Sequence, residues 1–168
     1  MIKNFNKHFV TMLGLGKIKK IPGTIASLIT TILLFLYFHI FNFSKIFFIF
    51  FYLIILIYAF IAVADYISSS DNKDPKEVVI DEFVGQSLPI YLYEISHGTE
   101  KDFIQSIYFY IIMFMVFRVF DIIKPFPVSY FDKNFKNSFG VIMDDIVAGL
   151  FVVLFLIFFM MMSIYFSL

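Results

Sequence analysis

The sequence predicts an all-α membrane protein, a polytopic bundle of four or five membrane segments whose N-terminus lies in the cytoplasm. Two observations indicate this class. Of the 168 residues, 61% are hydrophobic and 26 are phenylalanine, whereas a soluble domain is roughly half apolar at most. The apolar residues also form long runs, which short polar segments separate. A single domain over residues 1–168 accommodates all of these runs.

Four of the runs have the length of a membrane-spanning helix. A bilayer core takes about 20 helical residues, with a range near 17–25. The predicted spans are Ile25–Phe41, Ile46–Ala64, Phe103–Phe120 and Ile146–Phe166. A fifth run, Phe83–Tyr93, is shorter and contains Pro89. This segment either crosses with a tilt or re-enters as a half-helix packed against protein.

The positions of the basic residues favour five crossings. With the N-terminus inside and Phe83–Tyr93 crossing, eleven of the 13 Lys and Arg residues are cytoplasmic, and only Lys45 and Lys101 are outside. Lys73, in the polar linker Ser68–Pro75, counts among the eleven. If the short segment does not cross, the distribution weakens to eight against five. Cytoplasmic loops carry an excess of Lys and Arg, so we expect five crossings and an external C-terminus.

Composition also excludes several classes of function. The 13 basic and 13 acidic residues give a net charge of zero, which argues against a nucleic-acid partner. The absence of cysteine excludes disulfides, thiolate metal sites and a cysteine nucleophile. The basic segment Met1–Lys20 has no small-residue cleavage site, so we do not expect a removable signal peptide. The three histidines, His8, His39 and His97, lack metal-ligand spacing, and we interpret none as catalytic.

The first of four polar blocks precedes the first span and contains Pro22-Gly23-Thr24 and Ser27. Thr24 or Ser27 is placed to cap a helix, and the N–H groups of a helix N-terminus suit an anion. Capping alone is the simpler interpretation of this block.

The second block is Asp81-Glu82, which opens the short apolar run. Acidic residues at a helix N-terminus interact favourably with the helix dipole, but that explains one acid better than two. Gly85 lies four residues after Asp81 and shares its helix face, so a ligand or another helix can approach there. Charge beside a bilayer is costly, and this favours a functional interpretation.

The third block contains Arg118, Asp121 and Lys124, spaced to run along one side of a helix. Pro125 and Pro127 then end that helix. Arg118 is the only arginine in the chain, and its planar fork suits phosphate better than an ammonium group does. The alternative is an intrahelical ion pair with an arginine that snorkels to the interface.

The fourth block is Asp144-Asp145, which we expect to open the last span. Ala148 and Gly149 follow one turn later and permit tight helix packing at the depth of the acids. Adjacent carboxylates repel unless a cation or a proton lies between them. Mg²⁺ is the expected cation because it takes oxygen ligands and keeps waters for a phosphate. Asp132 is equally a further ligand or a loop residue.

In the predicted topology all four blocks meet at the cytoplasmic face, where they suit metal-assisted attack on a phosphate ester. The predicted metal ligands are Asp81, Glu82, Asp144 and Asp145. The predicted catalytic acids are Asp81, Asp121, Asp144 and Asp145. The predicted phosphate-binding residues are Arg118, Lys124 and Thr24.

The four blocks, in this order, resemble those of the bacterial phosphatidylglycerophosphatase A family. The resemblance covers residues 14–150, and its motifs are Pro22-Gly23-Thr24 with Ser27, Asp81-Glu82-Phe83-x-Gly85, Phe117-Arg118-x-x-Asp121-x-x-Lys124-Pro125-x-Pro127, and Phe131-Asp132 with Gly140 and Met143-Asp144-Asp145-Ile-x-Ala148-Gly149. Single blocks of this kind are weak signals, whereas four in register are specific.

The resemblance implies a magnesium-dependent phosphatase of the bacterial inner membrane. Its substrate would be a phospholipid in the bilayer, phosphatidylglycerophosphate, from which it would release the terminal phosphate to give phosphatidylglycerol. The nucleophile, water or an aspartate, and the oligomeric state stay open. One alternative is a different lipid phosphotransferase, although the Asp-Gly-x-x-Ala-Arg pattern of the CDP-alcohol enzymes is missing. A membrane transporter or assembly protein is another, but polar groups would then gather toward the midplane.

Overall fold

The computed structural model describes residues 2–69, 75–96 and 102–166. Lys73, His97 and Lys101, which bear on the predicted topology, lie outside these ranges, as does most of the polar linker. The described residues form helices and contain no strand, which confirms the all-α class. In chain order the elements are α1 (Ile2–Val10), η1 (Met12–Lys17), α2 (Pro22–Phe35), the π-helix η2 (Leu36–Ile40), α3 (Lys45–Ser68), α4 (Ile80–Ser96), α5 (Phe103–Ile123), α6 (Val128–Asn134) and α7 (Ser138–Phe166).

Four helical stretches are long and apolar enough to cross a membrane, in agreement with the four predicted spans. They are Pro22–Ile40, Lys45–Ser68, Phe103–Ile123 and Ser138–Met162. Large apolar side chains on their outer faces are exposed, as on α3, where Ile46, Phe47 and Ile54 are each more than 60% exposed. An apolar surface of this extent is unsuited to water and suits lipid.

Two predicted helix starts are wrong. α2 begins at Pro22 after Ile21, and neither Thr24 nor Ser27 caps it; proline suits this position because it lacks the N–H that would need a partner. α7 begins at Ser138 rather than at Ile146, so Asp144 and Asp145 lie in its second turn instead of opening it. The side chain of Asn137 accepts a hydrogen bond from the Gly140 N–H at 3.1 Å and so supplies the cap.

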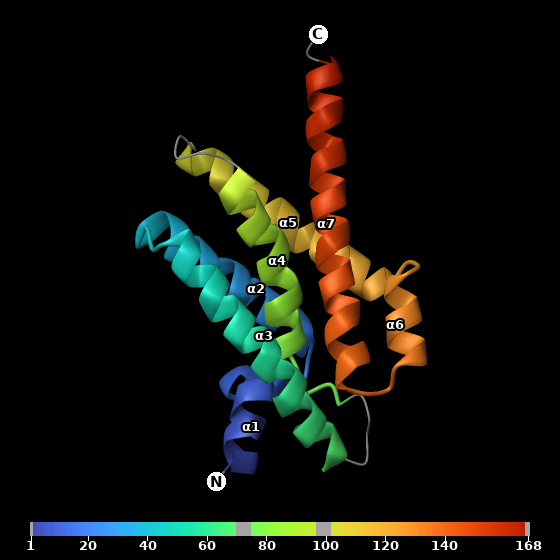
Figure 1. Ribbon diagram of the computed structural model, residues 1–168. Helices are drawn as coiled ribbons and strands as arrows, with labels where there is room; N and C mark the ends of the chain where they lie inside the picture. The colour runs from blue at the N-terminus through green and yellow to red at the C-terminus, as the bar shows by residue number, and fades with distance from the viewer. Residues whose placement is uncertain (1, 70–74, 97–101, 167–168) are drawn as a thin grey trace.

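Helix α4 lies at the centre of the bundle, where it packs against α2, α3, α5 and α7 (Figure 1). Its 17 residues include buried side chains on every face. At one end Glu82 contacts Arg118 of α5, and at the other Glu94 contacts His39 of η2. Because α4 extends between the same two ends of the bundle as α2 and η2, the predicted fifth crossing is geometrically feasible, and it stays a prediction.

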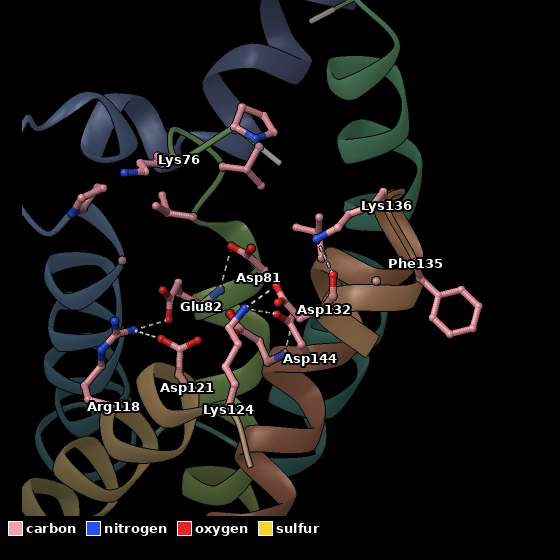
Figure 2. Close-up of a pocket in the computed structure, with 18 residues that line it drawn as sticks. Lys76, Asp81, Glu82, Arg118, Asp121, Lys124, Asp132, Phe135, Lys136 and Asp144 are labelled. Atoms are coloured by element: carbon pink, nitrogen blue, oxygen red, sulfur yellow. Dashed lines mark hydrogen bonds and ion pairs between the residues drawn. The ribbon is translucent and has the colours of Figure 1, made fainter. Parts of the chain in front are cut away.

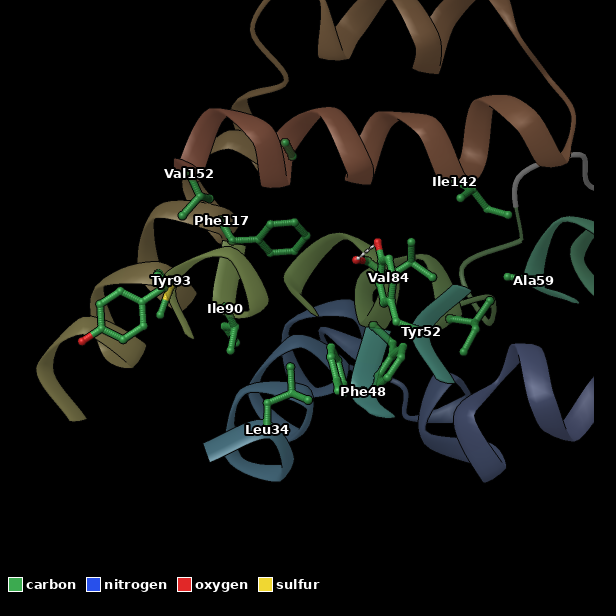
Figure 3. Close-up of a cluster of buried hydrophobic side chains, with 14 of the residues drawn as sticks. Leu34, Phe48, Tyr52, Ala59, Val84, Ile90, Tyr93, Phe117, Ile142 and Val152 are labelled. Carbon is green, nitrogen blue, oxygen red and sulfur yellow. Dashed lines mark hydrogen bonds between the residues drawn. The ribbon is translucent and has the colours of Figure 1, made fainter. Parts of the chain in front are cut away.

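The crossing of α4 and α7 depends on two glycines. A Cβ atom on Gly85 would lie 2.6 Å from the carbonyl oxygen of Asp145, and one on Gly149 would collide with the carbonyl oxygen of Gly85. The predicted close packing of small residues at the depth of the acids is therefore confirmed. Around this crossing the apolar core contains Phe48, Ile90 and Phe117 (Figure 3).

Candidate active site

A cavity of about 250 Å³ opens where the first turn of α4 meets α2, the end of α5, α6 and the start of α7 (Figure 2). The side chains that line it are mostly charged. The acids are Asp81, Glu82, Asp121, Asp132, Asp144 and Asp145, and the bases are Lys76, Arg118, Lys124 and Lys136. The structure therefore brings together the second, third and fourth polar blocks, with Pro22 and Gly23 from the first.

Arg118 organises one side of the cavity. Its Nη1 atom lies 2.7 Å from Glu82 Oε2 and 2.8 Å from Asp121 Oδ2, and it donates to Ser27 Oγ at 3.1 Å. Ser27 in turn donates to Glu82 Oε2 at 2.9 Å. The Arg118–Asp121 contact is the intrahelical ion pair considered above, but Glu82 and Ser27 extend it across three helices.

Lys124 organises the other side. It follows the last residue of α5 in a left-handed conformation with φ of 47°, and its Nζ atom lies 2.7 Å from both Asp132 Oδ1 and Asp144 Oδ2. Burial disfavours the charged amine, but Asp144 and Asp132 outweigh it and raise the pKa of Lys124. Asp132 thus belongs to the charged cluster rather than to a detached loop.

Three carboxylates converge closely enough to share a cation. One oxygen each from Glu82, Asp121 and Asp145 lie within 4.8 Å of one another. All three donors are carboxylate oxygens, the ligand type that Mg²⁺ prefers. Asp121 takes part in this set although we predicted it as catalytic, whereas Asp81 and Asp144, predicted as ligands, lie outside it.

The two acidic pairs have the same local arrangement. Asp81 Oδ1 accepts a hydrogen bond from the Glu82 N–H at 3.0 Å, and Asp144 Oδ1 accepts one from the Asp145 N–H at 3.1 Å. In each pair the first acid folds back over its own helix, and the second reaches the three-carboxylate set. The four side chains all line the cavity, but they divide into two positions.

The electrostatics of the site indicate a surplus of negative charge. Burial and the neighbouring acids Glu82 and Asp144 raise the pKa of Asp81 well above its usual range. Burial and Asp121 raise the pKa of Glu82 to about 7, against the opposing effects of Arg118 and Ser27. Two paired cations do not neutralise this many carboxylates, so a bound cation or protons must supply the remaining positive charge.

The residue of α2 that reaches the cluster is Ser27 and not Thr24. Ser27 is fully buried, and a Cβ atom on Gly23 would collide with Glu82 Oε1. Gly23 and Ser27 therefore form one face that holds the Glu82 carboxylate. Thr24 does not line the cavity. Sequence reasoning missed this role of Ser27, and its signal was the four-residue spacing from Gly23.

Comparison with known proteins bears on what such a cluster does. A family model described as phosphatidylglycerophosphatase A matches residues 8–160. The chain belongs to the phosphatidylglycerophosphatase A family. This confirms the resemblance drawn from the four blocks, and membership in the family supports a lipid phosphatase.

Two curated relatives match most of the length of this phosphatidylglycerophosphatase A family member, and a third matches a shorter part. A Haemophilus influenzae protein named phosphatidylglycerophosphatase A is 33% identical over 141 residues, 84% of this chain and 80% of the relative. A Bacteroides thetaiotaomicron protein, provisionally named a phosphatidylinositol-3-phosphatase, is 32% identical over 131 residues, 77% of each chain. The phosphatidylglycerophosphatase A of Escherichia coli is 47% identical over 36 residues, 21% of each chain. No solved structure matches.

Proposed function

We propose that the protein hydrolyses the terminal phosphate of phosphatidylglycerophosphate to give phosphatidylglycerol, with Mg²⁺ bound among its acids. In the overall reaction one water is consumed, the bond between the terminal phosphorus and the glycerol oxygen breaks, and the products are phosphatidylglycerol and inorganic phosphate. The observation that carries the proposal is the cavity in which six acids and four bases meet at one end of an apolar bundle. Acids and bases together suit a cation and a phosphate in contact with each other.

The residues at the cavity fit a magnesium ion. Glu82, Asp121 and Asp145 would hold it, because their oxygens are close together and two of the three side chains are buried. When bound, the ion would supply positive charge to the phosphate oxygens and lower the pKa of a bound water. Ser27 and Arg118 fix the orientation of Glu82, and Arg118 also fixes Asp121.

The bases have distinct roles in this proposal. The contacts of Arg118 with Glu82, Asp121 and Ser27 all run through Nη1, so the second arm of the guanidinium fork can donate to a phosphate oxygen. Lys124 is held between Asp132 and Asp144 at the cavity wall and adds positive charge near the phosphate. Asp81 and Asp144, each hydrogen-bonded to the next backbone N–H, are the candidates for proton transfer or for attack on the phosphorus.

A phosphate-release assay on the purified protein tests the proposal. Mixed micelles would contain phosphatidylglycerophosphate or, in parallel, phosphatidylinositol 3-phosphate, since relatives are named for both activities. We expect magnesium-dependent release from phosphatidylglycerophosphate at the higher kcat/KM. A protein that inserts and folds but releases phosphate from neither lipid would contradict the proposal. A clear preference for the inositol lipid would keep the phosphatase and replace its substrate.

The predicted site of action is the cytoplasmic face of the bacterial inner membrane. A reporter fused after Lys136 should behave as cytoplasmic, and one fused after Asn42 as periplasmic. Both positions would report the same side if α4 did not cross, because α5 would then run in the opposite direction. That result would refute the cytoplasmic placement and leave the shared cavity unchanged.

A further inference from the structure

We propose that Lys76 and Lys136 form a second anion site at the mouth of the cavity, and that this site binds the phosphodiester of the substrate head group. The inference rests on the proposed function and adds the reason why the enzyme would select its lipid. Phosphatidylglycerophosphate contains two phosphates, a diester next to the diacylglycerol and a terminal monoester. The acids and the cation act on the monoester, and the two lysines recognise the diester.

The four bases of the cavity divide into two pairs. Arg118 and Lys124 each contact two carboxylates at 2.7–2.8 Å, so much of their charge is balanced within the protein. Lys76 and Lys136 line the same cavity but are exposed, and within the described part of the chain neither forms an ion pair. Lys136 Nζ donates to the backbone oxygen of Asp132 at 2.6 Å, which orients the amine and leaves two of its protons for a ligand.

The two lysines lie on opposite sides of the opening. Lys76 belongs to the segment that leads into α4, and Lys136 to the connection between α6 and α7. In Figure 2 Lys76 and Lys136 lie above Asp81, to its left and right, whereas Arg118 and Lys124 lie below it. Buried Pro75 and the hydrogen bond from the Val79 N–H to the Val10 oxygen, 2.9 Å long, hold the Lys76 segment on its neighbours.

The charges of the site explain why such a pair is needed. The deep part of the cavity has more acids than bases, so it repels a lipid with two phosphates unless positive charge lies where the lipid enters. Exposed lysines at the rim of a cleft attract an anion and orient it. A head group whose monoester is at the acids places its diester toward the mouth, because the diester is joined to the acyl chains. Phosphatidate, which has a monoester and no diester, gains nothing from these lysines.

The experiment compares two lipids on matched variants. Lys76→Gln, Lys136→Gln and the double variant are assayed with phosphatidylglycerophosphate and with phosphatidate of the same acyl chains, at saturating magnesium. Lys133→Gln is the control, because Lys133 is also exposed on α6 but does not line the cavity. We expect KM for phosphatidylglycerophosphate to rise roughly threefold to tenfold for each lysine removed, with kcat and the KM for phosphatidate unchanged. Lys→Arg at both positions should restore KM.

The outcomes separate this inference from the function on which it rests. Release by the unaltered protein from neither lipid would overturn both. If the unaltered protein is active, an unchanged KM in the double variant would overturn the second anion site alone. An equal rise in KM for both lipids would also overturn it, because general attraction to an anionic micelle would then be the cause. Thermal melting of each variant in detergent shows that the comparison is made on folded protein.

Discussion

Helix α4 carries a single buried acid near its C-terminal end and a cluster of acids at its N-terminal end, and the two ends differ in how their charge is balanced. At the C-terminal end Glu94, only 3% exposed, contacts His39 Nε2 at 3.0 Å and accepts from Tyr110 Oη at 3.2 Å. Lys45 also donates to its backbone oxygen. One acid is therefore surrounded by several donors from η2, α3 and α5.

At the N-terminal end of α4 the ratio of acids to donors is reversed. Six acids line the cavity, and two of its four bases are already paired with them. A buried carboxylate with enough donors contributes to structure, whereas a surplus of carboxylates beside an open cavity requires a bound cation or protons to balance its charge. The difference shows that burial of an acid does not by itself indicate a ligand-binding site. Such a site is indicated by buried acids whose negative charge the surrounding protein groups do not balance.

Removing metal ions should reduce activity more than any substitution, and it directly tests the difference in charge balance between the two ends of α4. With a chelator, phosphate release should fall to background, because no cation then balances Glu82, Asp121 and Asp145. Magnesium should restore it, and calcium should do so poorly because its coordination is larger and looser. Full activity in chelator would mean that the charge of the cavity acids is balanced within the protein, as that of Glu94 is.

Neutralising one acid of the cavity should have the next largest effect on activity. Asp145→Asn or Glu82→Gln should lower kcat by about 10²-fold or more, the order expected for losing one electrostatic contact to the transition state. Asp81→Asn and Asp144→Asn should also lower kcat strongly, since both line the cavity. The measurement is single-substrate kinetics at saturating magnesium on variants whose thermal melt matches the unaltered protein. Near-normal kcat in all four variants would show that the acids of the cavity do not take part in catalysis.

Ser27→Ala should act indirectly and more weakly. It removes the hydroxyl that donates to Glu82 Oε2, and loss of such an outer contact typically lowers metal affinity about 10- to 100-fold. The magnesium concentration for half-maximal activity should therefore rise, while kcat at saturating magnesium changes less. Thr30→Val is the matched control on α2, since the Thr30 hydroxyl is buried without a hydrogen-bond partner among the described atoms. Equal magnesium curves for Ser27→Ala and Thr30→Val would contradict the role given to Ser27.

Glu94→Gln should have the smallest effect on turnover and a clear effect on stability. The charge that His39 and Tyr110 contact is lost, and the free energy of unfolding should fall by about 1–3 kcal/mol, as read from denaturation in detergent. Turnover should stay within about twofold, because Glu94 lies at the far end of α4. A loss of turnover comparable with that of Asp145→Asn would mean that the two ends of α4 are functionally linked.

The spans could be predicted from the sequence because bilayer thickness imposes a length on every apolar run. The start of α7 could not, since hydropathy identifies the lipid-facing part of a helix, whereas the Asn137 cap sets where the helix begins. Hydropathy also leaves α4 ambiguous: its polar residues are compatible with the interior only because α2, α5 and α7 surround it.

The composition of the site was predictable, and its internal pairing was not. Charge beside a membrane identified the acids, Arg118 and Lys124. The choice of Ser27 over Thr24 depends on the phase of α2, which starts at Pro22 and turns about 100° per residue. The entry of Asp121 into the three-carboxylate set depends on the angle at which α5 meets α4 and α7. Neither the role of Ser27 nor that of Asp121 can be predicted from the local sequence.

The contact between Gly85 and Asp145 has a consequence for the size of the ion that the proposed site would hold. Glu82 lies one turn before Gly85 on α4, and the backbone of Asp145 rests directly on Gly85. The distance between the backbones of Glu82 and Asp145 is therefore fixed by direct contact between the main chains of α4 and α7. No flexible side chain lies between the two helices at this point to absorb a change. A ligand cage built in this way has little freedom to expand, and a small ion with strict geometry suits it better than a large one. Selectivity among cations would then depend on two missing methyl groups, at Gly85 and at Gly149, as well as on the carboxylates.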